Sequence, residues 1–242
     1  NGCVNTDQVV VTVSPLPTAS ITASAATICV GASTTLTANG GTGFTYLWSN
    51  GATTQAITVS PSATTTYTVS VTNANGCTSA SAASQVITVN PLPVASITAS
   101  ASAVCVGTSA TLTASAGSSY LWSTGATTAA ITVTPTSTTS YSVTVTNANG
   151  CSATSAVTTI GVNPLPVVAA GNDAAICEGS STSLVASGAS TYVWSPSTGL
   201  SATNTASVTA NPTATTTYTV TGTDANGCVN TDQVVVTVSP LP

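Results

Sequence analysis

The sequence predicts an all-β protein built as a tandem array of small immunoglobulin-like β-sandwich domains. Two observations carry this prediction. The tripeptide Pro-Leu-Pro recurs at a near-constant interval, and the stretches between its copies alternate apolar and polar residues between turn signals. Alternation with a period of two indicates half-buried strands, and turn signals every 8–12 residues are typical of a sandwich. No stretch has the 3.6-residue period of a helix, so we expect almost no helix.

The Pro-Leu-Pro spacing defines the repeats. The tripeptide stands at 15–17, 91–93, 164–166 and 240–242, with spacings of 76, 73 and 76 that make a period of 225. Residues 1–17 are identical to residues 226–242, and self-similarity at a fixed period is the signature of a repeat architecture. We therefore expect a window cut from a longer repeating protein. Its segments are 1–17 as the C-terminal strand of a preceding repeat, and complete repeats at 18–93, 94–166 and 167–242.

The first complete repeat gives the expected order of elements. Thr and Val dominate its alternating stretches, and both favour strands. Asn-Gly pairs at 50–51 and 75–76 mark β-turns, because both residues tolerate positive φ. We predict strands at 18–24, 26–31, 33–38, 45–49, 55–61 and 64–72, and a last strand that ends at 85–89.

Aromatic residues recur at two places in each repeat. One Trp stands in a Tyr-x-Trp-Ser stretch, and one Tyr begins the strand that leads to the final hairpin. In the immunoglobulin sandwich a buried Trp and a corner Tyr occupy these places. A Trp inside an alternating strand is more often a core residue than a sugar-stacking one. We expect the six to anchor the cores: Trp48, Trp122, Trp194, Tyr67, Tyr141 and Tyr218.

The composition excludes several classes of function. The chain has no Lys, Arg or His, and five carboxylates give it a net charge of −5. Nucleic-acid binding depends on Lys and Arg that neutralise phosphates, and attraction to anionic membranes fails for the same reason. No apolar run is long enough for a membrane span. No nucleophile with a base and an orienting group can be assembled, so we expect no catalytic residue, no cofactor and no enzymatic activity.

The third repeat holds the only cluster of acids in its body. A hard cation needs six to eight oxygen ligands, several of them carboxylates. The first two repeats have no equivalents, so we expect solvated surface acids and no metal site. The residues are Asp173, Glu178 and Asp224.

Seven cysteines fall into two positional classes. One class stands in a Cys-x-Gly turn near the start of each repeat and the other in an Asn-Gly-Cys hairpin near its end; Cys3 belongs to the hairpin class. No Cys-x-x-Cys pair is present, which disfavours a zinc site, and disulfides indicate an oxidising compartment. We expect six cysteines to form disulfides: Cys29, Cys77, Cys105, Cys151, Cys177 and Cys228.

Two pairings remain open. Pairing within repeats (Cys29–Cys77, Cys105–Cys151, Cys177–Cys228) is favoured, because each repeat has one cysteine of each class. However, a seven-residue strand spans about 23 Å, far more than the roughly 6 Å between the Cα atoms of a disulfide. If the classes lie at opposite ends of each sandwich, Cys29 meets Cys151 and Cys105 meets Cys228 across the junctions between repeats.

These motifs resemble the immunoglobulin-like and PKD-like repeats of secreted Bacteroidota surface proteins. The resemblance rests on the order Cys-x-Gly, Leu-Thr-Ala, Tyr-x-Trp-Ser, Thr-Tyr, Asn-Ala-Asn-Gly-Cys and Asn-Pro-Leu-Pro. Such proteins include adhesins, gliding-associated proteins and extracellular fibres. The resemblance implies an extracellular or cell-surface location and a stalk or adhesive role, with no catalytic residue to carry over.

We expect a structural repeat region that forms the shaft of an extracellular filament or giant surface protein. The alternatives are an adhesive module that binds a carbohydrate or a surface, and a passive spacer of a secreted enzyme. Expected partners are neighbouring repeats and other copies of the chain, because edge strands lack the Lys residues that usually prevent sheet-to-sheet pairing. We expect no nucleic acid and no membrane insertion, and leave a surface glycan open.

Overall fold

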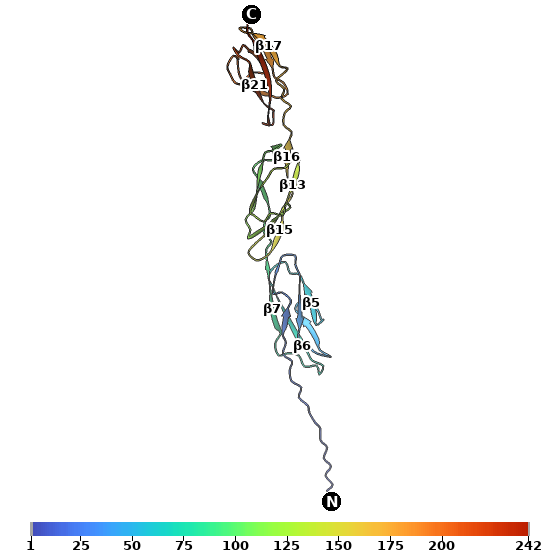
Figure 1. Cartoon of the computed structure of the whole chain (residues 1–242). Coiled ribbons are helices and arrows are strands. Elements are labelled where there is room, and N and C mark those ends of the chain that lie inside the picture. Colours follow the sequence, from blue (N-terminus) through green and yellow to red (C-terminus); the bar gives the residue numbers. More distant parts are fainter. Residues whose placement is uncertain (1, 242) are drawn as a thin grey trace. The chain divides into compact units, whose positions relative to one another are not determined.

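The computed structural model describes residues 2–241, which form twenty-two strands and no helix (Figure 1). The predicted all-β class is therefore confirmed. No helix in this part of the chain is long and apolar enough to cross a membrane.

The first repeat is a sandwich of a three-stranded and a four-stranded sheet, drawn in blue to cyan in Figure 1. The sheets have the orders β1-β3-β5 and β2-β7-β6-β4. The strands predicted at 18–24 and 26–31 are β1, in the three-stranded sheet, and β2, in the four-stranded sheet, and β2 runs parallel to the last strand, β7. The bounds are β1 Ile21–Ala23, β2 Thr27–Cys29, β3 Thr34–Ala38, β4 Thr45–Trp48, β5 Ala56–Val59, β6 Thr65–Thr72 and β7 Ala83–Asn90.

The second repeat has the same plan in shorter pieces. Its sheets are β12-β10-β8, β11-β14-β15 and β13-β16-β9, and β9 runs parallel to β16. The bounds are β8 Ile97–Ala99, β9 Ala103–Cys105, β10 Ala110–Ala114, β11 Ser119–Trp122, β12 Ala130–Val133, β13 Thr139–Tyr141, β14 Val143–Thr146, β15 Ser152–Thr154 and β16 Thr158–Asn163.

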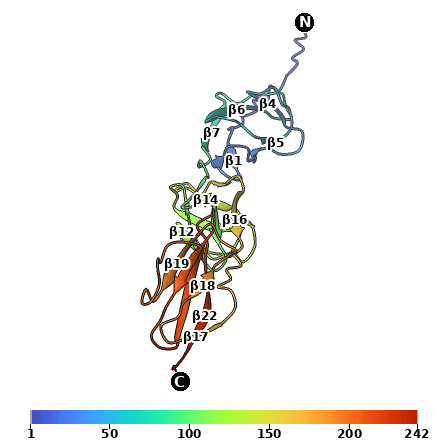
Figure 2. The same cartoon turned by 90° about the horizontal axis from the view of Figure 1, so that it is seen from above.

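The third repeat, orange to red in Figure 2, pairs a four-stranded sheet, β17-β22-β21-β19, with the ribbon β18-β20. Its first segment makes only an isolated bridge, Ala169 to Ser187, where the other repeats have a strand. The bounds are β17 Ala174–Cys177, β18 Thr182–Val185, β19 Thr191–Ser195, β20 Ser207–Ala210, β21 Thr216–Thr223 and β22 Val229–Ser239.

Each repeat buries its own apolar cluster around its Trp. Trp48, Trp122 and Trp194 are each 2 % exposed. Their indole Nε1–H groups donate to the carbonyls of Thr54, Thr128 and Thr205, at 2.8, 2.8 and 3.0 Å. A buried indole thus keeps a hydrogen-bond partner, and its strand is fixed to the loop that follows.

The three predicted tyrosines also pack at the cores. Tyr141 and Tyr218 are buried, and Tyr67 is half-buried against the first cluster. The Tyr218 hydroxyl donates to the Thr198 carbonyl at 2.8 Å, and burial raises the pKa of this phenol.

Residues 2–17 differ from their identical copy near the C-terminus. The later copy contains all of β22, which pairs with β21 and β17. The earlier copy has no strand, and Val9 and Val11 are 88 % and 80 % exposed where Val234 and Val236 are fully buried. A strand needs partner strands for its backbone groups and its apolar face, and within residues 2–241 this segment pairs with none.

The contacts within the chain define two compact units. One contains residues up to Val94 together with Thr146–Ala153, and the other contains Ala95–Val145 with residues from Thr154 onward. The hairpin at 146–153 therefore groups with the first repeat although it belongs to the second by sequence.

Truncation of a core Trp tests the role of the repeated indole. We expect Trp122→Ala to lower the free energy of unfolding by about 3–5 kcal/mol, because it leaves a cavity in the second core. The neighbouring Leu121 is 56 % exposed on the opposite face of β11, so Leu121→Ala should change stability by no more than about 0.5 kcal/mol. Urea denaturation of both variants measures the difference. Equal losses would show that the indole is not a core anchor.

Candidate functional site

The Cys-x-Gly cysteines lie where the chain leaves each sandwich. Each one ends a short strand that runs parallel to the last strand of its own repeat, opposite that strand's final residue. The next residue donates its backbone N–H to the carbonyl of that final residue. The donor–acceptor pairs are Val30 to Asn90 at 3.0 Å, Val106 to Asn163 at 3.0 Å and Glu178 to Ser239 at 2.9 Å.

The hairpin cysteines lie at the other end, where the chain enters each sandwich. In the second repeat the Asn147 Oδ1 atom accepts the backbone N–H groups of Asn149 and Cys151, both at 3.0 Å. Gly150 has a φ of +77°, which favours glycine. The Asn147 Nδ2 group donates to the Pro91 carbonyl at 3.0 Å, so this side chain ties the hairpin to the incoming Pro-Leu-Pro segment.

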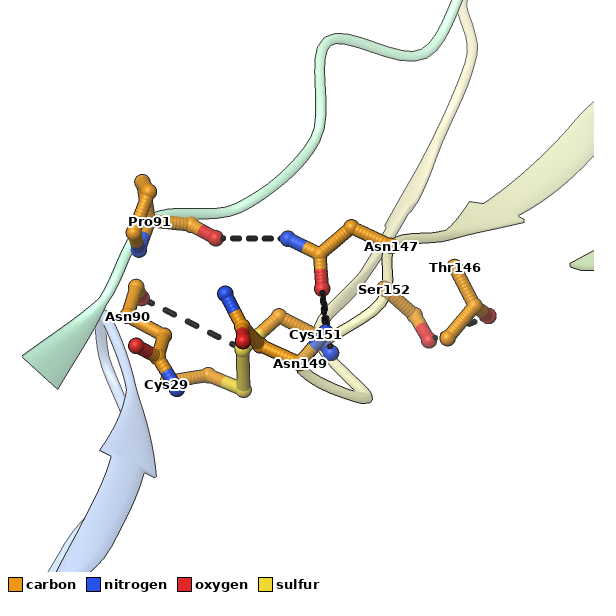
Figure 3. Close-up of a disulfide and its surroundings, with 8 residues drawn as sticks. All are labelled: Cys29, Asn90, Pro91, Thr146, Asn147, Asn149, Cys151 and Ser152. Atoms are coloured by element: carbon orange, nitrogen blue, oxygen red, sulfur yellow. Dashed lines mark hydrogen bonds between the residues drawn. A yellow bond between two sulfur atoms is a disulfide. The ribbon is translucent and has the colours of Figure 1, made fainter. Parts of the chain in front are cut away.

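The two cysteine classes meet at the junctions between repeats. Cys29 and Cys151 form a disulfide with Cα atoms 5.6 Å apart (Figure 3). The Cys151 sulfur is buried and lies 4.0 Å from the Asn90 carbonyl oxygen. Cys105 and Cys228 form the second disulfide, also with Cα atoms 5.6 Å apart. Each disulfide joins one repeat to the next beside a Pro-Leu-Pro segment.

The pairing expected within repeats is wrong. The structure forms Cys29–Cys151 and Cys105–Cys228, the alternative across the junctions, and leaves Cys3, Cys77 and Cys177 as free thiols. The cause is distance. In the first repeat the eight residues of β7 separate the hairpin that holds Cys77 from the end beside Cys29, which is about 26 Å. A disulfide needs Cα atoms about 6 Å apart.

The third repeat achieves the same attachment with other residues. Asp224 replaces the turn Asn and accepts the N–H groups of Asn226 and Cys228, both at 2.8 Å, but a carboxylate cannot donate. The amide of Asn230 donates instead to the Pro166 carbonyl at 3.0 Å. The linker carbonyl thus keeps its donor. Nothing in the sequence of one repeat indicates that the Asn230 side chain binds the Pro-Leu-Pro linker.

Carboxylates hold the first segment of the third repeat to β22. The Asp232 Oδ2 atom accepts the Ala170 N–H, and the Asp173 Oδ1 atom accepts the Val235 N–H, both at 2.8 Å. Hydrogen bonds from two backbone N–H groups lower the pKa of the Asp232 carboxyl. The bond from Ala170 has the larger effect and the bond from Gln233 the smaller. Within residues 2–241 no three acidic, Cys or His side chains form a group that could hold a metal ion. Asp173 accepts a backbone N–H from β22, and Asp224 accepts two from its own turn.

Phe44 is the one aromatic residue that the sequence places in a glycine-rich loop. Its ring is half-buried and packs against the first core cluster. It thus contributes to the first sandwich core.

The first repeat is similar to a described domain type. Residues 17–91 match the model of the Ig-like domain, CHU_C associated. No curated protein matches the sequence.

Similar solved structures include a 1.5-MDa bacterial ice-binding adhesin, with 14 % identity, coverage of 93 % of this chain and 99 % of that chain, and a TM-score of 0.39. A Ca²⁺-stabilised adhesin of an Antarctic bacterium has 16 % identity, coverage of 94 % and 75 %, and a TM-score of 0.42. Extracellular domains 3–5 of Drosophila OTK have 12 % identity, coverage of 88 % and 93 %, and a TM-score of 0.33.

A charge substitution tests the bond between hairpin and linker. Asn147→Asp keeps the acceptor for the turn but loses the donor to Pro91. The loss of one hydrogen bond costs about 0.5–1.5 kcal/mol. We therefore expect the equilibrium constant for forming Cys29–Cys151 in a glutathione redox buffer to fall about 2–10-fold. Asn149→Asp, the same charge at an exposed position of the same turn, is the matched control. An equal effect in both variants would mean that charge, rather than the bond to Pro91, is responsible.

Proposed function

We propose that this chain is a structural repeat region that forms the shaft of an extracellular filament or giant cell-surface protein. The observation that carries the proposal is that both disulfides cross junctions between repeats. A disulfide within one sandwich would stabilise that sandwich alone. A disulfide between two repeats carries load past the linker, which is what a shaft requires.

The covalent path through the chain is short because the two disulfides overlap in sequence. From end to end it needs 88 backbone steps: 28 to Cys29, 46 back from Cys151 to Cys105, and 14 from Cys228. The full backbone has 241 steps. Pulling on the ends therefore cannot extend most of the sandwich bodies, even after every hydrogen bond has broken.

The location outside the cell is part of the same proposal. Stable disulfides form in oxidising compartments, and the match of residues 17–91 to an Ig-like domain model agrees with a surface-protein repeat. A chain without Lys or Arg also offers no cleavage site to trypsin-like proteases. We propose no enzymatic activity for it.

Single-molecule pulling from the two ends tests the load path. At about 3.6 Å per residue, the end-to-end length of the oxidised chain should reach its limit at about 320 Å, and that of the reduced chain at about 850 Å. The double variant Cys77→Ser/Cys177→Ser controls for the pairing. It should keep the short limit, whereas pairing within repeats would leave only Cys105–Cys151 and a limit near about 700 Å. An oxidised chain that extends fully would refute the proposal.

We also propose that arrays associate side by side through edge strands. The strands β4, β11 and β19 lie at sheet edges, and each shows one exposed apolar residue beside its buried Trp. These residues are Leu47, Leu121 and Val193, at 61 %, 56 % and 57 % exposure. The edges carry no Lys, the usual protection against pairing between sheets.

Sedimentation velocity at increasing concentration tests this association. The chain should form oligomers, and Leu47→Thr/Leu121→Thr/Val193→Thr should shift it toward monomer, because Thr keeps strand propensity and removes apolar contact. If the unmodified chain stays monomeric at high concentration, lateral assembly is wrong. The covalent tandem array would be unaffected by that result.

A further inference from the structure

The two disulfides follow one rule of spacing. Each joins a Cys-x-Gly cysteine to the hairpin cysteine of the following repeat, at a sequence separation of 122 or 123. Cys177 belongs to the first class and has no partner in residues 2–241. Because the period is 225, the Cys77 position of a following copy has a sequence separation of 125 from Cys177. The small difference reflects the unequal lengths of the repeats.

Cys177 has the backbone setting of the cysteines that are already paired. It ends β17 opposite Ser239, as Cys29 ends β2 opposite Asn90. Its carbonyl accepts the backbone N–H of Ser180 at 3.0 Å, which forms the same turn as the bond from Ala32 to Cys29 at 3.0 Å. The Cys177 side chain is exposed.

Cys77 has the setting of Cys151. Its backbone N–H donates to the Asn73 Oδ1 atom at 2.9 Å, and the Asn73 Nδ2 group donates to the Pro15 carbonyl at 3.2 Å. The Cys77 sulfur lies 3.9 Å from the Ser14 carbonyl oxygen. The Cys151 sulfur lies 4.0 Å from the equivalent Asn90 oxygen. The first hairpin therefore places the Cys77 thiol as the second hairpin places the disulfide-bonded Cys151 sulfur.

The free thiols Cys77 and Cys177 lie beside equivalent residues of the repeated sequence. Ser14 and Ser239 occupy one position of the repeated sequence, exactly one period apart. Ser14 contacts the Cys77 sulfur, and Ser239 accepts the N–H of Glu178, next to Cys177. At the Cys29–Cys151 disulfide one residue, Asn90, makes both of these contacts. Its carbonyl oxygen lies against the Cys151 sulfur and accepts the N–H of Val30, next to Cys29. The two ends of the chain therefore each present one half of the same junction.

We propose that Cys177 forms a disulfide with Cys77 of the copy of the period that follows it, so that the junction between periods is clamped like the other two. By the same rule Cys3, which occupies the position of Cys228, pairs with Cys105 of a preceding copy. The inference rests on the proposed function in requiring successive copies. It adds that no junction is held by the backbone alone.

The bond forms by thiol–disulfide exchange with a small disulfide oxidant such as oxidised glutathione. The Cys77 thiolate attacks the oxidant and releases one glutathione thiolate. The Cys177 thiolate then attacks the Cys77 sulfur of the mixed disulfide and releases the second. Two protein thiols are oxidised by two electrons, and the oxidant is reduced to two glutathione molecules that take up the two protons.

The closed pattern shortens the covalent path of a long array. Over two periods the path needs 80 backbone steps: 26 from Cys151 to Cys177, 28 from Cys77 to Cys105, and 26 from Cys228 to the next Cys29. Without the Cys177–Cys77 bond, one junction in three would lack a second covalent connection.

The test is a tandem chain in which residues 18–242 follow Pro242 a second time. After oxidative folding in glutathione buffer, denaturation and alkylation with iodoacetamide, intact mass gives the number of thiols. The second copy adds six cysteines. We expect three thiols in the tandem chain, the same number as in the single chain. If the new bond did not form, the tandem chain would have five thiols.

Cys177→Ser in the first copy distinguishes the two outcomes, because it changes the number of thiols in opposite directions. It should raise the number of thiols from three to four, because it frees the Cys77 of the second copy. If the bond does not form, the same variant lowers the number from five to four. Five thiols in the tandem chain, with both disulfides intact in the single chain, would overturn this inference and leave the proposed shaft standing. Loss of the disulfides in the single chain would overturn the shaft itself.

Discussion

The length of a β-sandwich relative to the reach of a disulfide is the constraint on which the rest of this structure depends. The two cysteine classes lie at opposite ends of each sandwich, separated by a strand of eight residues in the first repeat. A disulfide spans about 6 Å between Cα atoms and cannot join them. A cysteine at a sandwich end can therefore reach only a cysteine of the neighbouring repeat, and the covalent network must cross the junctions.

The junctions are built from backbone carbonyls at the ends of strands and linkers. In the first junction the Asn90 carbonyl accepts one amide and lies against one sulfur, and the Pro91 carbonyl accepts the amide of Asn147. In the second, Asn230 makes the equivalent bond to Pro166. The two prolines of each Pro-Leu-Pro segment have no N–H to contribute, so the segment offers three backbone carbonyls and only the one N–H of its Leu.

Most of the fold could be predicted from the sequence, whereas for the cysteines the sequence left two pairings open and favoured the one that the structure does not form. Alternation and turn residues predict the strands because the strand period is local. The disulfides depend on which sandwich end each cysteine occupies, and local pattern does not give that. The two identical copies of the seventeen-residue segment show the same limit. Val236 is buried and Val11 is exposed although their neighbours in sequence are the same, because a strand is defined by its partners.

The lack of basic residues determines what kind of cohesion this chain can use. Without Lys, Arg or His no side-chain ion pair can form, so the sandwiches depend on apolar clusters, backbone pairing and disulfides. Ionic strength weakens interactions between exposed charges, but it has little effect on buried apolar contacts or covalent bonds. A shaft made in this way loses the specificity that charges give to surfaces. It gains junctions whose strength is nearly independent of the salt concentration around it.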